Sequence, residues 1–276
     1  AFDLPVALGY LLASNQISFD PREKMFLGEL GLDGTLRKIS GVLPIALAAE
    51  ICGFRQIILP KGSGIEAAVL ENIEIIEVES LSEMIEYLSG VKTLSPLHKT
   101  EVNLEVVAGS LDFSDIKGQE TAKRSLEIAA AGGHNILMYG PPGAGKTILA
   151  RALPSILPKL TFAEALEVTK IYSVAGKLTN GESLVRCRPF LSHHHTASGV
   201  ALVGGGAWPR PGEISLAHRG VLFLDEFGEF PRACLENLRQ PLEDGVIHVS
   251  RAAANLNFPA KFILIAAMNH CPCGYY

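Results

Sequence analysis

The sequence lacks the marks of a membrane protein, a secreted disulfide scaffold and a strongly basic domain. No apolar run has the length of a transmembrane helix and no signal peptide is present, so we expect a cytoplasmic protein without a membrane partner. Five cysteines, an odd number without regular spacing, argue against a disulfide framework. The net charge of -5 guarantees no basic face, so any contact with nucleic acid has to come from local segments.

An initiator methionine and a capped first helix are also missing. The opening stretch AFDLPVALGYLLAS has a helical apolar pattern from its first residues, and the final NHCPCGYY follows directly on a strand pattern. We therefore expect a fragment at both ends.

The composition is that of a globular α/β protein. With 48% hydrophobic and 19% charged residues, 276 residues suffice for one large or two medium domains. Helix and strand patterns alternate over residues 1–92, which predicts a small α/β domain. Residues 93–111 have no clear periodicity and indicate a linker. Residues 112–276 form a second α/β region, in which we expect a long, loop-rich stretch up to about Pro211.

A glycine-rich loop between a predicted strand and a predicted helix indicates a nucleotide site. The stretch GPPGAGKT fits the pattern G-x-x-x-x-G-K-[ST], in which backbone N–H groups close around phosphate oxygens. Lys146 supplies a positive charge to the terminal phosphates, and the hydroxyl of Thr147 is a ligand for Mg²⁺. The predicted nucleotide-binding residues are Gly140, Pro141, Pro142, Gly143, Ala144, Gly145, Lys146, Thr147 and Ile148.

Two later strands end in polar residues that suit hydrolysis. The apolar run VLFLDE ends in Asp225, which we expect to hold Mg²⁺, and in Glu226, which we expect to activate the attacking water. The strand FILIAAMN ends in Asn269, whose amide suits a hydrogen bond to that water or to the γ-phosphate. The alternatives are a helix-capping acid and an asparagine that caps a strand end.

Histidine and cysteine clusters raise the question of a metal. In SHHHTAS, at 192–198, adjacent side chains on an extended chain point to opposite faces, so we favour a structural or nucleotide-sensing loop over a metal site. Cys271 and Cys273 form half of a zinc site, and zinc there stays open as a minority hypothesis.

A hairpin pattern lies between the acidic strand and the asparagine strand. The segment EDGVIHVSRAAANLNFPAKF predicts two paired strands, with Arg251 and the small residues after it near the tip. The alternative is an ordinary hairpin with a solvated arginine.

Together these stretches resemble the magnesium-chelatase-like AAA+ ATPases of the YifB/ComM group. GQETAKRSLEIAAAGGHNILMYGPPGAGKT, HHHTASGVALVGGG, PRPGEISLAHRGVLFLDEF, LRQPLEDGVIHVSRA and AAMNHCPCGYY carry the resemblance from about residue 112 to the end. GELGLDGTLRKISGVLPIALAA and IILPKGSGIEAA resemble the Lon-protease-like domain that precedes the ATPase in this group. The resemblance implies a P-loop AAA+ three-layer sandwich behind a Lon-like α/β domain that is incomplete at its N-terminus.

The resemblance also implies an activity. It implies ATP hydrolysis with Mg²⁺ by a ring oligomer, expected to be a hexamer, and for the ComM members branch migration of DNA in recombination. The family's phosphate loop falls on Gly140–Thr147, its acidic pair on Asp225 and Glu226, its sensor asparagine on Asn269, and its pore-facing hairpin on Val246–Phe258. His270 departs from the proline usual after the sensor, and the arginine finger and second sensor would lie beyond Tyr276.

Two other activities share parts of this pattern. A chelatase subunit that drives metal insertion into a porphyrin has a similar ATPase core, and a Lon-related ATPase adaptor or protease could have the first region. We do not expect a protease, because the place where Lon resemblance would put the lysine that activates a serine nucleophile is Pro44, which has no amine.

Overall fold

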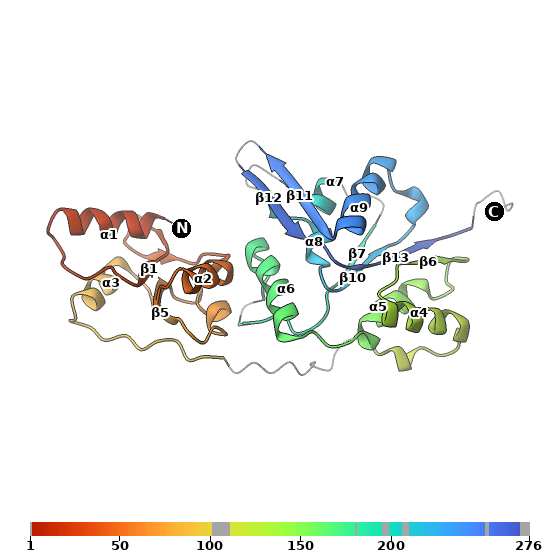
Figure 1. Cartoon of the computed structure of the whole chain (residues 1–276), viewed down its shortest axis with the longest axis horizontal. Helices are drawn as coiled ribbons and strands as arrows, with labels where there is room; N and C mark the ends of the chain where they lie inside the picture. The colour runs from red at the N-terminus through yellow and green to blue at the C-terminus, as the bar shows by residue number, and fades with distance from the viewer. Residues whose placement is uncertain are drawn as a thin grey trace. The chain divides into compact units, whose positions relative to one another are not determined.

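The computed structural model of the chain describes residues 2–100, 111–179, 181–194, 199–205, 210–251 and 254–270. By its internal contacts the chain divides into two compact units (Figure 1). Unit 1 comprises Ala1–Asn103 and Tyr172–Val185, and unit 2 comprises Leu104–Ile171 and Arg186–Tyr276. Within the described ranges, no helix combines the length and the apolar character needed to cross a membrane.

Unit 1 is built on a small parallel sheet with the strand order β1-β4-β5. Leucines of α1 and Met84 of α3 pack against Ile58 and Ile76 of the sheet in one buried cluster. The strands are β1 (Lys24–Phe26), β2 (Glu29–Leu30), β3 (Leu36–Arg37), β4 (Gln56–Pro60) and β5 (Glu74–Val78), of which β2 and β3 form a short antiparallel pair. The helices are α1 (Asp3–Ala13), α2 (Val42–Ile51), the 3-10 turn η1 (Ile65–Ala67) and α3 (Leu81–Leu88).

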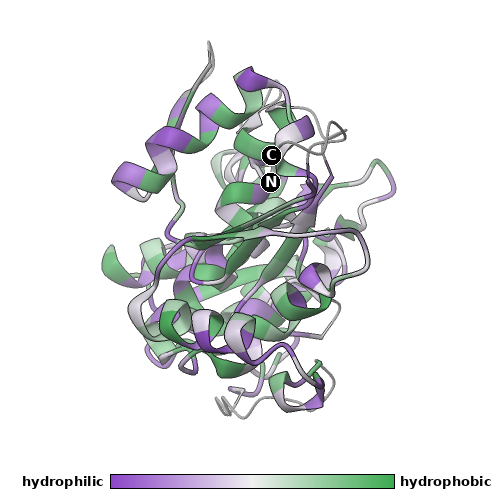
Figure 2. Cartoon of the chain, turned by 90° about the vertical axis from the view of Figure 1, so that its right-hand side faces the viewer, coloured by the Kyte–Doolittle hydropathy of each residue, from purple (hydrophilic) through white to green (hydrophobic). Residues whose placement is uncertain are grey.

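Unit 2 has a four-stranded parallel sheet with the order β6-β13-β10-β7. Every residue of β10 is buried, which explains its uninterrupted apolar sequence VLFL. Figure 2 shows mainly hydrophobic strands through this sheet and helices of mixed hydropathy around them. The strands are β6 (Ile136–Tyr139), β7 (Phe190–His193), β8 (Gly204–Gly205), β9 (Arg210–Pro211), β10 (Val221–Leu224), β11 (Val246–Arg251), β12 (Ala254–Pro259) and β13 (Ile263–Met268).

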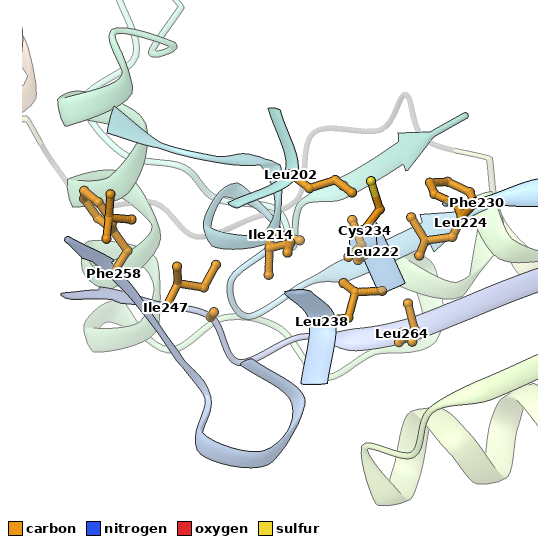
Figure 3. Close-up of a cluster of buried hydrophobic side chains, with 13 residues drawn as sticks. Leu202, Ile214, Leu222, Leu224, Phe230, Cys234, Leu238, Ile247, Phe258 and Leu264 are labelled. Carbon is orange, nitrogen blue, oxygen red and sulfur yellow. The ribbon is translucent and has the colours of Figure 1, made fainter. Parts of the chain in front are cut away.

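Two buried clusters cover opposite faces of this sheet. Leu126 of α4 and Leu149 of α5 pack on one side with Phe223. Cys234 and Leu238 of α9 pack on the other side with Leu222 (Figure 3). The helices of unit 2 are η2 (Phe113–Asp115), α4 (Glu120–Gly132), α5 (Lys146–Ile156), α6 (Phe162–Ala175), α7 (Gly199–Val203), α8 (Glu213–Leu216), η3 (Phe227–Glu229) and α9 (Arg232–Asp244), and α6 continues into unit 1. The expected three-layer α/β fold with a parallel central sheet is confirmed.

The hairpin predicted between the acidic and the asparagine strands is present. β11 and β12 pair antiparallel from Val246 opposite Pro259 to Arg251 opposite Ala254. Figure 1 shows this two-stranded ribbon projecting from the rest of unit 2. Ile247 and Phe258 near its base join the buried cluster on the α9 side of the sheet (Figure 3).

The prediction of a loop-rich stretch before Pro211 was wrong for much of that stretch. It contains the 14-residue helix α6 and the edge strand β7. A capping box begins α6: Thr161 N–H donates to Glu164 Oε2 at 3.0 Å, and Glu164 N–H donates to Thr161 Oγ1 at 3.3 Å. The pattern T-x-x-E before an apolar run is a local sign of a helix start. The mixed apolar periodicity of FAEALEVTKIYSVA obscured that sign.

Candidate functional site

The glycine-rich loop lies at the carboxyl end of β6, where it turns into α5. Gly143 and Gly145 have φ angles of +79° and +87°, in the left-handed region where a side chain is disfavoured. Gly145 is the N-cap residue of α5, and the helix begins at Lys146. The first-turn N–H groups of a helix have no intrahelical partner, so they form a ready anion site at this end of α5.

Lys146 and Asn269 meet at this loop from positions far apart in the sequence. The Nζ of Lys146 donates to the carbonyl oxygens of Gly140 at 2.7 Å and Pro141 at 2.9 Å. It also donates to Oδ1 of Asn269 at 2.9 Å. The pairing of β13 with β6 causes this contact, because it places Met268 opposite Tyr139, one residue before the loop. All three ammonium protons therefore have an oxygen acceptor on the chain itself.

The two residues expected to bind Mg²⁺ also lie together. Thr147 Oγ1 donates to Oδ2 of Asp225 at 3.3 Å. The other carboxylate oxygen of Asp225 accepts from Glu226 N–H at 3.0 Å. Glu226, the second residue after β10, has a φ of +52°, which is uncommon for a non-glycine residue and marks a constrained backbone.

Two histidines of the HHH stretch lie beside this acidic pair. His193 ends β7 opposite Leu224 of β10, and its carbonyl accepts from Asp225 N–H at 3.2 Å. His194 Nδ1 lies 3.8 Å from Glu226 Oε2, while His193 Nε2 lies 3.6 Å from Glu213 Oε2. Neighbouring histidines thus reach two different glutamates instead of one shared ion.

No metal site of histidine, cysteine and acidic residues is found in the described part of the chain. Among the described residues, three or more such side chains do not come together at any one point. His195, Cys271 and Cys273 lie outside the described residues. Cys52 and Cys187 are exposed free thiols, and Cys234 is a buried one.

The predicted site residues enclose one cavity of about 390 Å³. Its donor set combines an ammonium group, a hydroxyl, two carboxylates and the start of α5, which fits a polyphosphate with a magnesium ion. Gly140 and Pro141, also predicted to bind nucleotide, do not line it. The lining residues are Pro142, Gly143, Ala144, Gly145, Lys146, Thr147, Ile148, Asp225, Glu226 and Asn269.

A second cavity, of about 380 Å³, adjoins the first and was not predicted from the sequence. The two share Gly143, Ala144, Gly145 and Ile148. The second one adds the segment before α4, where Gln119 has a φ of +58° and its Nε2 lies 3.4 Å from the carbonyl of Ala144. Leu111, Asp115, Ile116, Lys117, Gln119 and Leu149 complete its lining. The sequence shows the stretch DFSDIKGQE only as a loop ahead of the helix, so it carries no local sign of this cavity.

Comparisons with known proteins identify the family of the chain. The family described as "Magnesium chelatase, subunit ChlI" matches residues 112–276, and "Subunit ChlI of Mg-chelatase" matches residues 1–63. Competence protein ComM of Haemophilus influenzae is 46% identical over 281 residues, which cover 100% of this chain and 54% of that protein. The uncharacterized protein YifB of Escherichia coli is 45% identical over 279 residues, with 100% and 54% coverage.

A Lon protease is a more distant relative. Lon protease 2 of Bacillus subtilis is 29% identical over 146 residues, which cover 51% of this chain and 26% of that protein. This similarity bears out the Lon-like part of the predicted fold. The chain spans about half the length of the ComM and YifB relatives that it matches. By its family match over residues 112–276 and its similarity to ComM and YifB along its own whole length, the chain belongs to the magnesium-chelatase-like AAA+ ATPases of the YifB/ComM family.

Proposed function

We propose that the chain carries the ATP-hydrolysing core of a ring-forming motor that acts on DNA. The observation that carries the ATPase part is the convergence of Lys146, Thr147, Asp225, Glu226 and Asn269 on one cavity. These are the residue types that P-loop hydrolases use to hold phosphate and magnesium and to position water. Family membership supports the same activity.

Each residue has a distinct role in this proposal. Lys146 exchanges its carbonyl and amide partners for phosphate oxygens, while Thr147 and Asp225 hold Mg²⁺. When bound, MgATP supplies the phosphoryl group that is transferred to water. Glu226 orients that water and accepts its proton, and Asn269 fixes the water or the terminal phosphate.

The second cavity suits the nucleobase. It adjoins the phosphate cavity through Gly143 and Ala144, and Ile116 and Leu149 give it apolar walls. A flat apolar ring with polar edges fits such a space. We therefore assign the base to this cavity.

The DNA part of the proposal rests on the β11–β12 hairpin. Arg251 is the last paired residue of β11 before the tip. In a ring, one arginine per subunit would form a positive collar although each chain has a net charge of -5. A collar of this kind contacts phosphates without reading bases, so its affinity should fall with rising salt. The similarity to ComM of Haemophilus influenzae, a competence protein, supports a role on DNA.

The test is the ATP turnover of the full-length protein with and without DNA. We expect single-stranded or branched DNA to stimulate turnover. Gel filtration with light scattering should report the mass of an oligomer, which we propose to be a hexameric ring. Turnover that no DNA stimulates at any salt concentration would contradict the DNA role. ATP-dependent proteolysis is expected to be absent in the same preparation.

The second candidate is a chelatase-type ATPase, which the family match over residues 112–276 favours. Under this alternative, a porphyrin-binding partner subunit rather than DNA would stimulate turnover. Parallel assays with DNA, with a porphyrin-binding chelatase subunit and with neither separate the two candidates. Stimulation by neither would favour a Lon-related ATPase adaptor.

A further inference from the structure

The β11–β12 hairpin leaves the ATPase core at a tightly packed root. Gly245 directly precedes β11 with a φ of +68°, and a Cβ added to it would lie 2.9 Å from Cγ of Lys261. Ala260 N–H donates to the carbonyl of Gly245 at 2.8 Å. Residues 245, 260 and 261 therefore define the point at which the hairpin joins the core, and we call them the hairpin root.

The turn between α8 and β10 binds both the N–H and the carbonyl group of Lys261 in the hairpin root. Lys261 N–H donates to Nδ1 of His218 at 3.0 Å. Arg219 N–H donates to the carbonyl of Lys261 at 2.6 Å. Arg219 has a φ of +60°, so the turn that makes these two hydrogen bonds has a constrained backbone.

The side chains of the same turn bind helix α6. His218 Nε2 lies 3.1 Å from Oε2 of Glu167, and Nε of Arg219 donates to the same oxygen at 2.9 Å. The hydrogen bond from Arg219, followed by that from His218, holds the pKa of Glu167 below its ordinary value. The negatively charged carboxylate of Glu167 thus accepts from both residues and ties the turn to α6.

The hydrogen bonds of His218 require one neutral form of its ring. Nδ1 accepts a proton from Lys261 N–H, so it carries none itself, and Nε2 must carry the proton to donate to Glu167. The side chain is only 2% exposed, and burial lowers its pKa, against the attraction of Glu167. Arg219 and Lys261 are the other charged groups that act on it, and both disfavour its protonation.

We infer that His218 is a positioning residue that locks the hairpin root to the core, so that the hairpin moves with its own subunit as one rigid body. The alternative is a hairpin that swings about its root. In the locked arrangement, hydrogen bonds connect Lys261 through the α8–β10 turn to Glu167 of α6. The consequence for DNA movement rests on the proposed function, whereas the lock itself does not.

The first test of the lock measures the structure of the protein by NMR and hydrogen exchange and does not depend on ATP turnover or DNA binding. Nitrogen-15 spectra of the histidine rings should show a protonated Nε2 and an unprotonated Nδ1 at His218. In His218→Ala the Lys261 amide loses its acceptor, so its hydrogen exchange should be about 5- to 150-fold faster. His218→Asn keeps an acceptor near the position of Nδ1 and should restore most of the protection.

A matched control separates the lock from ordinary surface pairs. Glu167→Gln should loosen the same root, while Glu127→Gln, which weakens an exposed pair with Arg124 on α4, should leave Lys261 exchange unchanged. A proton on Nδ1, or wild-type exchange at Lys261 in both His218→Ala and Glu167→Gln, would overturn the inference.

The coupling is tested in the full-length oligomer. His218→Ala should keep basal ATP turnover and nucleotide KM within about twofold and lose its stimulation by DNA, and His218→Asn should recover it. Full stimulation with a loosened root would show that the hairpin works without the lock. If DNA stimulates nothing even in the wild type, the proposed function fails, and the exchange measurement still decides whether the lock exists.

Discussion

Asn269 offers the sharpest separation of nucleotide binding from turnover. Its Oδ1 accepts from Lys146 Nζ at 2.9 Å, at an exposed contact. Asn269→Asp would place a negative charge there, and two unit charges 2.9 Å apart attract each other by about 1.4 kcal/mol in bulk water. Because the contact is exposed, the value for water is the appropriate one. That energy corresponds to about a tenfold change in an equilibrium constant.

The charge and the amide should therefore affect different steps. A lysine partly neutralised by the introduced carboxylate attracts phosphate less, so Asn269→Asp should raise the nucleotide Kd about tenfold. Asn269→Ala removes the amide without adding charge, so Kd should stay within about twofold while turnover falls by about 10²–10³, the usual cost of a lost polar group at a reaction centre.

The assay is a nucleotide titration by calorimetry, followed by single-turnover hydrolysis in the full-length protein. The difference between the two variants should shrink at high salt, because exposed charges are screened. Equal Kd values for Asn269→Asp and Asn269→Ala would refute the electrostatic argument. Wild-type hydrolysis by Asn269→Ala would remove this residue from the reaction centre.

Three further changes test other parts of the molecule. Glu226→Gln should bind ATP normally and lower turnover at least about 100-fold, and normal turnover would refute its role as base. Arg251→Ala should weaken DNA binding and flatten its salt dependence, whereas Arg239→Ala on α9, which breaks an exposed pair with Glu243, should do neither. The pKa of His218 is lower in the folded protein than its ordinary value of 6.5, so the unfolded chain takes up a proton on this ring at a higher pH than the folded protein does. The free energy of unfolding should therefore fall as the pH drops below about 6.5, and the fall should be smaller in His218→Asn.

The phosphate site could be predicted because its signs are local. The glycine loop is one continuous motif, and Asp225 and Asn269 stand where apolar strands end. In a parallel sheet the carboxyl ends of all strands share one edge, so the residues that follow them are expected on the same side of the sheet. The contact of Lys146 with Asn269 joins residues 123 positions apart, and it depends on β13 pairing directly with β6, which the strand patterns themselves do not specify.

The remaining parts depend on packing that no local pattern encodes. The cavity beside Ile116 forms only when the segment before α4 folds against the glycine loop. The contacts of His193 and His194 with separate glutamates depend on β7 lying next to β10. β7 lies within the stretch that was expected to be loop-rich, so neither the strand nor its partners could be derived from the sequence.

The unbroken pairing of the β11–β12 hairpin gives it the geometry of a lever. Each strand has six residues without a bulge, so the ribbon is about 20 Å long. Because the root is fixed to the core, a rotation of the core by about 10° about the root would move the far end of this ribbon of about 20 Å by roughly 3.5 Å. That displacement matches the roughly 3.4 Å spacing of nucleotides along one DNA strand. A subunit that grips DNA at this tip would thus need only a small tilt to advance by one nucleotide.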